Sequence, residues 1–167
     1  MDRSAVHMSG EGEEITLKFS GPIDETVKFA DIRLPPSMRR LALDLGQVSI
    51  LNSSGLRAWV LWVRSLEKRI GVFFRNCPMN VISQMNILDG FVPMGAIVDS
   101  FQVPYFCESC KRETLKIAVR GKDFVEATPD TKSGILIKEF ETCPHCKATM
   151  QWDVVPEIYF KFLKPRR

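Results

Sequence analysis

The sequence has few histidines, no long apolar run and no glycine-rich phosphate-binding loop. Its only histidines are His7 and His145, and no segment approaches the roughly 18 uninterrupted apolar residues of a transmembrane helix. The N-terminal residues lack the apolar core of a secretory signal peptide. Acidic residues are scattered, and no pair of them suggests a shared cleft. These absences argue against catalysis, membrane insertion and secretion, and we expect a cytoplasmic protein that is not an enzyme.

An excess of charge of one sign is also nearly absent. The 167 residues carry a formal net charge of +3, with 45% hydrophobic and 26% charged residues, which is ordinary for a globular protein. The basic excess follows Phe106, where 12 basic residues stand against 9 acidic ones, and includes Lys161, Lys164, Arg166 and Arg167. Nucleic-acid binding through this basic C-terminal part is therefore only a secondary hypothesis.

Helices and strands are predicted to alternate in residues 13–104. Apolar or alternating runs predict strands over 14–20, 40–45, 72–74 and 95–103. Helical spacing of apolar residues predicts helices over 24–33, 55–70 and 79–89. Such alternation predicts an α/β fold with at least some parallel strand pairing. Residues 1–12 are predicted to form a flexible leader ahead of this domain.

From residue 105 onward the pattern predicts strands only. The strand candidates are 114–119, 135–140, 149–154 and 157–163. We therefore expect a small β-rich domain over residues 105–167.

Four of the five cysteines form two CxxC pairs within this second domain. Cys107 and Cys110 are separated from Cys143 and Cys146 by 32 residues. Two such turns supply four thiolates, the tetrahedral sulfur shell that Zn²⁺ prefers, and leave no coordination position open for water. The spacing therefore predicts a zinc ribbon with a structural zinc ion. The alternatives are a redox-active dithiol pair and a ribbon that has lost its metal. Between the second pair, His145 is not needed as a ligand, and the isolated Cys77 is expected to be a buried thiol.

The segment 43–56, LDLGQVSILNSSGL, carries a further pattern. It resembles the signature of the STAS domain, the anti-sigma-factor antagonist family, in which a strand, an Asp-Ser-Ser-Gly-Leu turn and an amphipathic helix follow one another. The resemblance extends over residues 13–103, with GPID at 21–24 and GVFFRNCP at 71–78. It implies a small STAS-like sheet covered by helices, and a signalling function through protein–protein interaction.

The turn itself has a physical interpretation beside the resemblance. Asn52 and Ser53 can cap the free N–H groups of the following helix, and Ser54 stands at its N-terminus, where negative charge is favoured. The family resemblance implies phosphorylation of Ser54 by an anti-sigma-type kinase. Here Asn52 replaces the usual first aspartate, so the turn keeps a cap but offers no carboxylate. Plain helix capping by the serines is the alternative interpretation.

The outer face of the predicted helix offers a surface for a partner. Arg57 and Leu61 lie opposite its core stripe, with Trp62 on the flank. We therefore hypothesise a regulatory module that binds a protein through Asn52, Ser53, Ser54, Gly55, Arg57 and Leu61. The alternatives are a nucleic-acid-associated protein that uses its basic zinc ribbon, and a structural subunit of a larger assembly in which Leu61 and Trp62 are buried.

Overall fold

The computed structural model describes residues 3–66, 68–127, 132 and 134–164 of the chain. The chain divides into two compact units, Met1–Asp99 and Ser100–Arg167. The predicted mixed α/β class is confirmed. The division lies before Ser100 rather than after residue 104, because residues 100–107 form one uninterrupted strand of the second unit. Of the basic tail, Arg166 and Arg167 lie outside the described residues.

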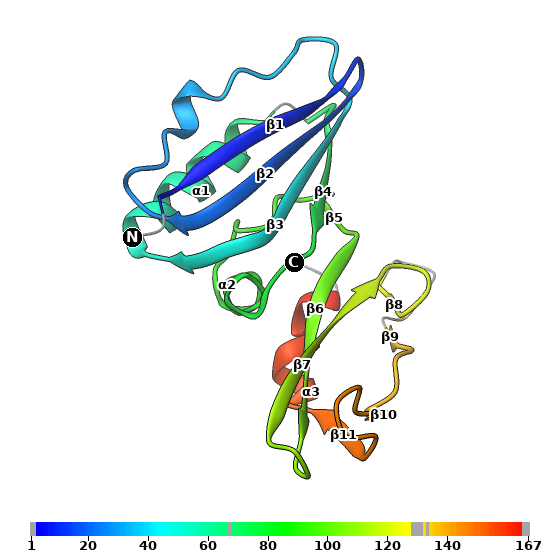
Figure 1. The fold of residues 1–167 in the computed structure, drawn as a ribbon. Coiled ribbons are helices and arrows are strands. Elements are labelled where there is room, and N and C mark those ends of the chain that lie inside the picture. The colour runs from blue at the N-terminus through cyan, green and yellow to red at the C-terminus, as the bar shows by residue number, and fades with distance from the viewer. Residues whose placement is uncertain (1–2, 67, 128–131, 133, 165–167) are drawn as a thin grey trace. The chain divides into compact units, whose positions relative to one another are not determined.

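The first unit contains a five-stranded sheet in the order β1-β2-β3-β4-β5 (Figure 1). Its strands are β1 (Ala5–Glu11), β2 (Glu14–Ile23), β3 (Arg40–Leu51), β4 (Gly71–Arg75) and β5 (Ile97–Val98). Strand β1 pairs antiparallel with β2, and the three remaining pairings are parallel. The predicted parallel pairing is therefore confirmed.

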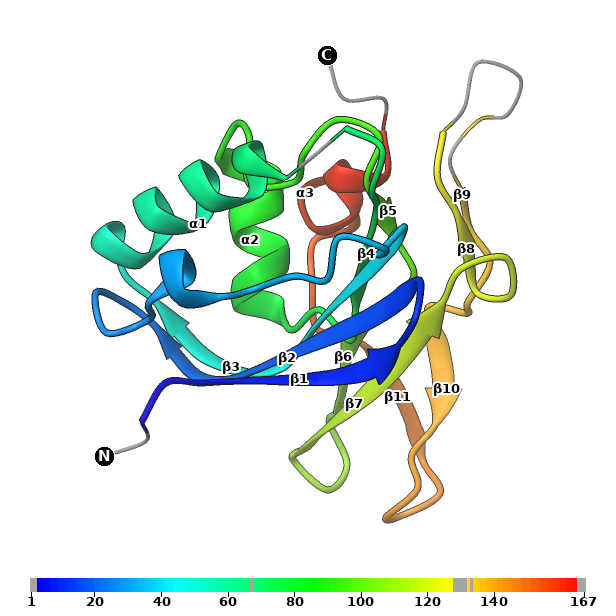
Figure 2. The ribbon, with the colours of Figure 1, turned by 90° about the horizontal axis from the view of Figure 1, so that it is seen from above.

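Two helices connect the parallel strands. Helix α1 (Ser53–Ser65) joins β3 to β4, and α2 (Met79–Ile87) leads from β4 towards β5. Figure 2 shows both helices on the same side of the sheet, together with the segment between β2 and β3. A parallel strand pair requires such a crossover connection. Helix α2 begins at the predicted residue and ends two residues early, whereas α1 begins two residues before its predicted start and ends five residues before its predicted end.

The core of the first unit is built around Trp59 of α1, which is fully buried. Its ring lies 5.5 Å from the ring of Phe19, 6.1 Å from that of Phe74 and 5.2 Å from that of Phe91. Its indole N–H donates a hydrogen bond of 2.9 Å to the carbonyl oxygen of Phe91. Because the one polar atom of this side chain has a partner, its burial carries no desolvation penalty from an unpaired donor. Trp59 thus joins α1 to the sheet and to the loop after α2.

Trp62 is buried rather than exposed on the flank of α1. Only 8% of the residue is accessible, and its ring stacks on that of Phe29 at 5.3 Å. The helix buries a wider stripe than the predicted one because the segment before β3 brings Phe29 over the α1 surface. Leu61 remains exposed, at 60%.

Two further predictions for the first unit need correction. Residues 5–11, expected in a flexible leader, form β1 and pair with β2 along their whole length. The helix predicted over 24–33 is reduced to a 3₁₀ turn, η1 (Phe29–Asp31). Ahead of η1, the Asp24 carboxylate accepts hydrogen bonds from the backbone N–H and the hydroxyl of Thr26. Such a local turn competes with helix formation.

The second unit contains a four-stranded sheet in the order β10-β11-β6-β7 and a small β8-β9 pair. The strands are β6 (Ser100–Cys107), β7 (Arg112–Val119), β8 (Phe124–Val125), β9 (Gly134–Ile135), β10 (Phe140–Thr142) and β11 (Thr149–Trp152). The predicted strand over 135–140 is thus divided between β9 and β10, and the one over 95–103 between β5 and β6.

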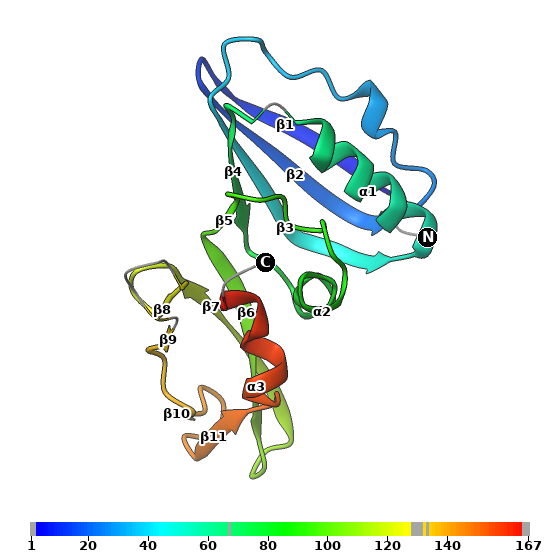
Figure 3. The ribbon, with the colours of Figure 1, turned by 180° about the vertical axis from the view of Figure 1, so that it is seen from behind.

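Residues 157–163 are helical, which contradicts the predicted strand. They belong to α3 (Pro156–Tyr159) and the 3₁₀ helix η2 (Phe160–Leu163), and Figure 3 shows this helical segment beside β6 and β7. Pro156 occupies the first helical turn, where its missing N–H costs nothing. The rings of Phe160 and Phe162 lie 6.0 Å and 5.0 Å from that of Phe101. Aromatic packing on one side of the sheet therefore outweighs the alternating pattern.

Across the residues that the structure describes, no helix has the length and apolar character needed to cross a bilayer.

Replacement of Trp59 tests the central packing of the first unit. We expect Trp59→Ala to lower the free energy of unfolding by about 3–5 kcal/mol, because it opens a cavity in the core. The matched control, Leu61→Ala on the exposed face of the same helix, should change it by less than about 0.5 kcal/mol. Urea unfolding followed by circular dichroism measures both. Equal losses in the two variants would contradict this assignment of the core.

Candidate functional site

The four cysteines of the CxxC pairs lie at two matching turns of the second unit. Cys107 ends β6, and Cys110 lies in the turn to β7. Cys143 follows β10, and Cys146 lies in the turn to β11. Figure 1 shows both turns at the same end of this unit. The antiparallel hairpins therefore bring together two pairs of residues that lie far apart in the sequence.

The two turns share the same backbone geometry. The N–H of Lys111 donates to the carbonyl of Cys107 at 2.8 Å, and that of Lys147 donates to Cys143 at 3.0 Å. Both lysines adopt positive φ angles, 56° and 66°. This left-handed conformation is unfavourable for a residue with a Cβ atom. Its repetition at the same position of both turns indicates that the sharp bend is required to direct the two thiols inward.

The sulfur atoms form a compact cluster. All four lie within 4.8 Å of one another, with 3.5 Å between Cys107 and Cys146 and 3.7 Å between Cys110 and Cys143. A tetrahedral ion with Zn–S bonds of about 2.3 Å would hold its sulfurs about 3.8 Å apart. The cysteine cluster therefore has the donors and the spacing to hold one tetrahedral metal ion.

The backbone favours the thiolate form at the first cysteine of each pair. The N–H of Cys146 donates to the Cys143 sulfur and lowers the pKa of this thiol to about 6. The N–H of Cys110 lowers the pKa of Cys107 in the same way. In contrast, burial raises the pKa of Cys110 to about 12. Because four neighbouring thiolates repel one another, a cation is needed to hold them all in the charged form.

His145 does not belong to the cysteine cluster. Its Nδ1 atom lies 3.2 Å from the Arg112 guanidinium, on the exposed side of the turn. Cys77 lies in the first unit and is fully buried, as expected. Four sulfurs would complete a tetrahedral shell around one bound ion.

Removal of one sulfur tests the cysteine cluster. We expect the purified protein to contain about one tightly bound metal ion per chain, as a single tetrahedral site requires. Cys143→Ser should lose this ion, because a serine hydroxyl is not a competent replacement for a thiolate. The matched control Cys77→Ser should retain it. Elemental analysis by mass spectrometry measures the stoichiometry, and full metal content in Cys143→Ser would contradict the site.

The second candidate site is the turn at the start of α1. Asn52 caps the helix, since its side-chain oxygen accepts a hydrogen bond of 2.9 Å from the N–H of Gly55. Its side-chain nitrogen donates to Glu25 at 2.9 Å, and its backbone N–H donates to the carbonyl of Ile23 at 3.2 Å. The hydrogen bond from Asn52 lowers the pKa of Glu25. The turn is thus tied to the chain just after β2 by side-chain and backbone bonds.

Gly55 fits this turn because the backbone after β2 passes directly over it. A Cβ atom at this position would overlap the carbonyl of Ile23 and would lie 2.7 Å from the backbone nitrogen of Asp24. Any larger residue would push the helix away from the sheet. Gly55 therefore has a structural role, and as a buried residue it offers little surface to a partner.

The predicted partner-binding residues otherwise lie at the surface. Ser53, Ser54, Arg57 and Leu61 are exposed, and so is Asn52. The spacing of Ser54, Arg57 and Leu61 places them along one face of α1. Sequence reasoning missed Glu25, which anchors Asn52 from 27 positions away. No local signal identifies such a contact, because it depends on how the loop after β2 returns to the helix.

Neither a protein-family model nor a curated protein sequence matches this chain.

Removal of the cap tests the geometry of the turn. We expect Asn52→Ala to lower the free energy of unfolding by about 0.5–2 kcal/mol, as loss of an N-cap does. It should also raise the pKa of Glu25 towards its ordinary value, which NMR titration measures. The matched control Ser53→Ala should leave both quantities nearly unchanged. An unchanged Glu25 pKa in Asn52→Ala would contradict the contact between the two side chains.

Proposed function

We propose that this chain is a regulatory protein-interaction module, similar in function to an anti-sigma-factor antagonist, that acts in the cytoplasm. It binds a protein partner through the Asn52–Gly55 turn and the outer face of α1. The observation that carries the proposal is the exposed row formed by Ser54, Arg57 and Leu61 on a helix whose opposite side is fixed by Trp59. A rigid helix that presents an apolar residue beside a cation is a suitable docking surface.

The order of elements supports the same proposal. The strand, capped turn and helix of the STAS-like signature correspond to β3, the Asn52–Gly55 turn and α1. The preceding strand β2 pairs parallel with β3. The turn lies at the carboxyl end of the central strand β3 and its residues Asn52, Ser53 and Ser54 are exposed, so a partner can reach it. Binding rather than catalysis is the function that these features favour.

Phosphorylation of Ser54 is the proposed switch. The side chain is exposed and lies in the first turn of α1, where a phosphate would be stabilised by the helix dipole and free N–H groups. The added charge of about −1.5 to −2 would change the surface beside Arg57 and Leu61. A partner that binds the unmodified surface would then be released, and an anti-sigma-type kinase would serve as both modifier and partner.

We further propose that the ion in the cysteine cluster is zinc, in a structural role. Four cysteine sulfurs in a closed tetrahedral arrangement favour Zn²⁺ over cations that prefer oxygen ligands. When bound, the ion would join the β6–β7 and β10–β11 hairpins and supply stability that the small core of this unit lacks.

Protein binding is favoured over nucleic-acid binding. Several cations of the second unit already have carboxylate partners: Lys111 pairs with Glu108, Lys116 with Glu141 at 3.1 Å, and Arg120 with Glu126 at 3.4 Å. These pairs reduce the positive charge available to a phosphate backbone. Among the described residues, no contact favours nucleic-acid binding over protein binding.

Site-specific photocrosslinking in the host tests the proposed surface. A photoreactive residue at Leu61 should capture a discrete protein partner, whereas one at Lys18, an exposed residue of β2, should not. Ser54→Asp in the Leu61 probe should reduce this crosslink by about tenfold, as a loss of 1.4 kcal/mol would.

The matched control for this experiment is Ser53→Asp, which adds the same charge one residue earlier and on a different side of the helix. It should leave the crosslink largely intact. Equal capture from Leu61 and Lys18 would contradict the docking surface. Equal capture with and without Ser54→Asp would remove the switch while leaving the surface in place.

A further inference from the structure

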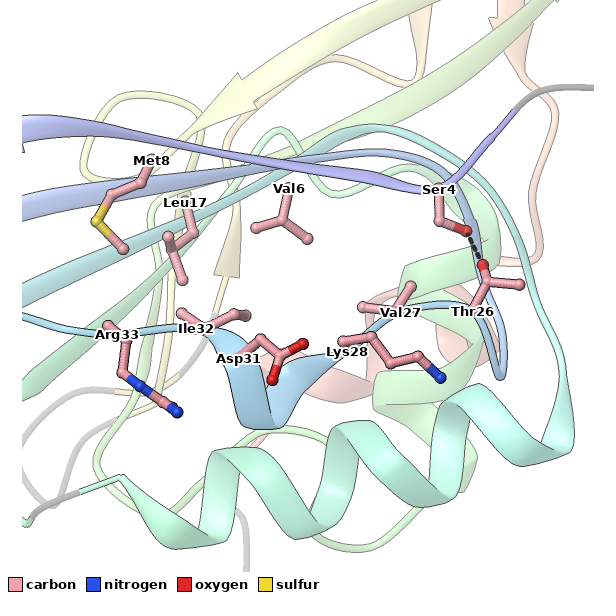
Figure 4. A pocket seen from close by; sticks show the side chains of 10 residues that line it. All are labelled: Ser4, Val6, Met8, Leu17, Thr26, Val27, Lys28, Asp31, Ile32 and Arg33. Carbon is pink, nitrogen blue, oxygen red and sulfur yellow. Dashed lines mark hydrogen bonds between the residues drawn. The ribbon is translucent and has the colours of Figure 1, made fainter.

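A pocket of about 500 Å³ lies in the first unit, lined by residues of β1, of β2 and of the segment between β2 and β3. It opens between β1 and the segment that contains η1, and Figure 4 shows the side chains of both elements pointing into it. Its volume falls within the range of roughly 300–1,000 Å³ that is typical of small-molecule sites.

The pocket exists because the sheet is wider than its helical cover. Strand β1 adds a fifth strand at the edge of the sheet, and the segment 24–33 forms only a short 3₁₀ turn instead of a full helix. Val6 of β1 is consequently half-buried and Met8 is 38% exposed, although both lie on the side of the sheet that faces the core. Leu17 on the neighbouring strand is fully buried and offers no accessible surface of its own. The apolar floor that is open to a ligand is therefore formed by Val6 and Met8.

The polar residues at one end of the pocket are already satisfied. The Ser4 hydroxyl donates to the carbonyl of Pro22 at 2.7 Å, and the Thr26 hydroxyl lies 2.9 Å from that of Ser4. These bonds close that end and leave little capacity for a ligand. Polar recognition must come from the charged rim instead.

The rim carries two cations and one carboxylate. Lys28, Asp31 and Arg33 all line the pocket and are exposed. None of them takes part in an ion pair within the described part of the chain. Arg33 donates only to the carbonyl of Ala30. The rim therefore has a net charge of +1 that is not neutralised locally, and it complements a ligand with one negative charge.

We propose that this pocket binds a small amphipathic monoanion, of the class of medium-chain carboxylates. Its apolar chain lies against Val6 and Met8, and its carboxylate lies at the rim beside Lys28, on the side away from Asp31 (Figure 4). Burial of the chain supplies the affinity, at roughly 25 cal/mol per Å² of apolar surface, and the net positive charge of the rim selects the charged end group. The site is independent of the proposed docking surface on α1.

Titration with three ligands of equal chain length tests this site. Decanoate and decylamine, each below its critical micelle concentration, and decanol, below its solubility limit, are added to the full-length protein and followed by ¹H–¹⁵N NMR. Decanoate should give saturable shifts at the β1 and η1 residues of the pocket, with an affinity at least about fivefold above that of decylamine. Decanol should bind more weakly than decanoate because it lacks the charge.

Two variants locate the binding. Lys28→Glu should weaken decanoate binding by about fivefold or more, whereas the matched control Lys18→Glu, an exposed lysine on β2 whose neighbour Leu17 lines the pocket, should not. Val6→Phe should block all three ligands by filling the floor, and retained spectral dispersion shows that it folds. Absence of saturable shifts at the pocket would overturn the proposal, as would equal affinity for decanoate and decylamine.

Discussion

The close approach of the α1 N-terminus to the chain after β2 is the constraint on which the first unit depends. Gly55 leaves room for the carbonyl of Ile23, and Asn52 bonds to both Ile23 and Glu25. Farther along the helix, about 6 and 10 Å beyond Gly55 at about 1.5 Å per residue, the buried side chains of Trp59 and Trp62 attach it to the core, and their rings lie 5.6 Å apart. Because these contacts fix one side of α1, the residues on its other side are presented to solvent in a defined arrangement.

A different constraint organises the second unit. Its sheet is small, and its core consists largely of aromatic side chains around Phe101, which lies 4.8 Å from Phe124. The turns that carry the cysteines contain two residues in the left-handed conformation, Lys111 and Lys147. A metal ion bound by four thiolates would compensate for the cost of these turns and for the small core. Metal binding and folding are therefore expected to be linked in this unit.

Much of the architecture could be predicted from local patterns. The helical spacing around Trp59 and the alternating RLALDL run each gave the right element, because their periods match the side that the sheet buries. The failures have two causes, a local turn in one case and nonlocal contacts in the other. Asp24 forms a local turn with Thr26 where a helix was expected, and Phe160 and Phe162 pack against the distant Phe101 instead of extending a sheet. Strand β1 has no alternation strong enough to reveal its pairing with β2.

The candidate sites also differ in how far local sequence patterns predict them. The CxxC spacing alone was sufficient to predict that Cys107, Cys110, Cys143 and Cys146 come together, since the chemistry of a tetrahedral sulfur site demands it. The contact between Asn52 and Glu25 and the pocket beside β1 could not be predicted, because each depends on the course of the loop between β2 and β3. The burial of Trp62 depends on that loop as well, through Phe29.

The central claim is that a charge placed on Ser54 controls the surface of α1. Phosphosite mapping of the protein purified from its own host, under growth and stress conditions, tests it most directly. The account predicts a phosphate on Ser54 in at least one condition, with Ser53 unmodified. A Ser54 that stays unmodified in every condition would contradict the switch and would leave the Asn52–Gly55 turn with the role of a helix cap.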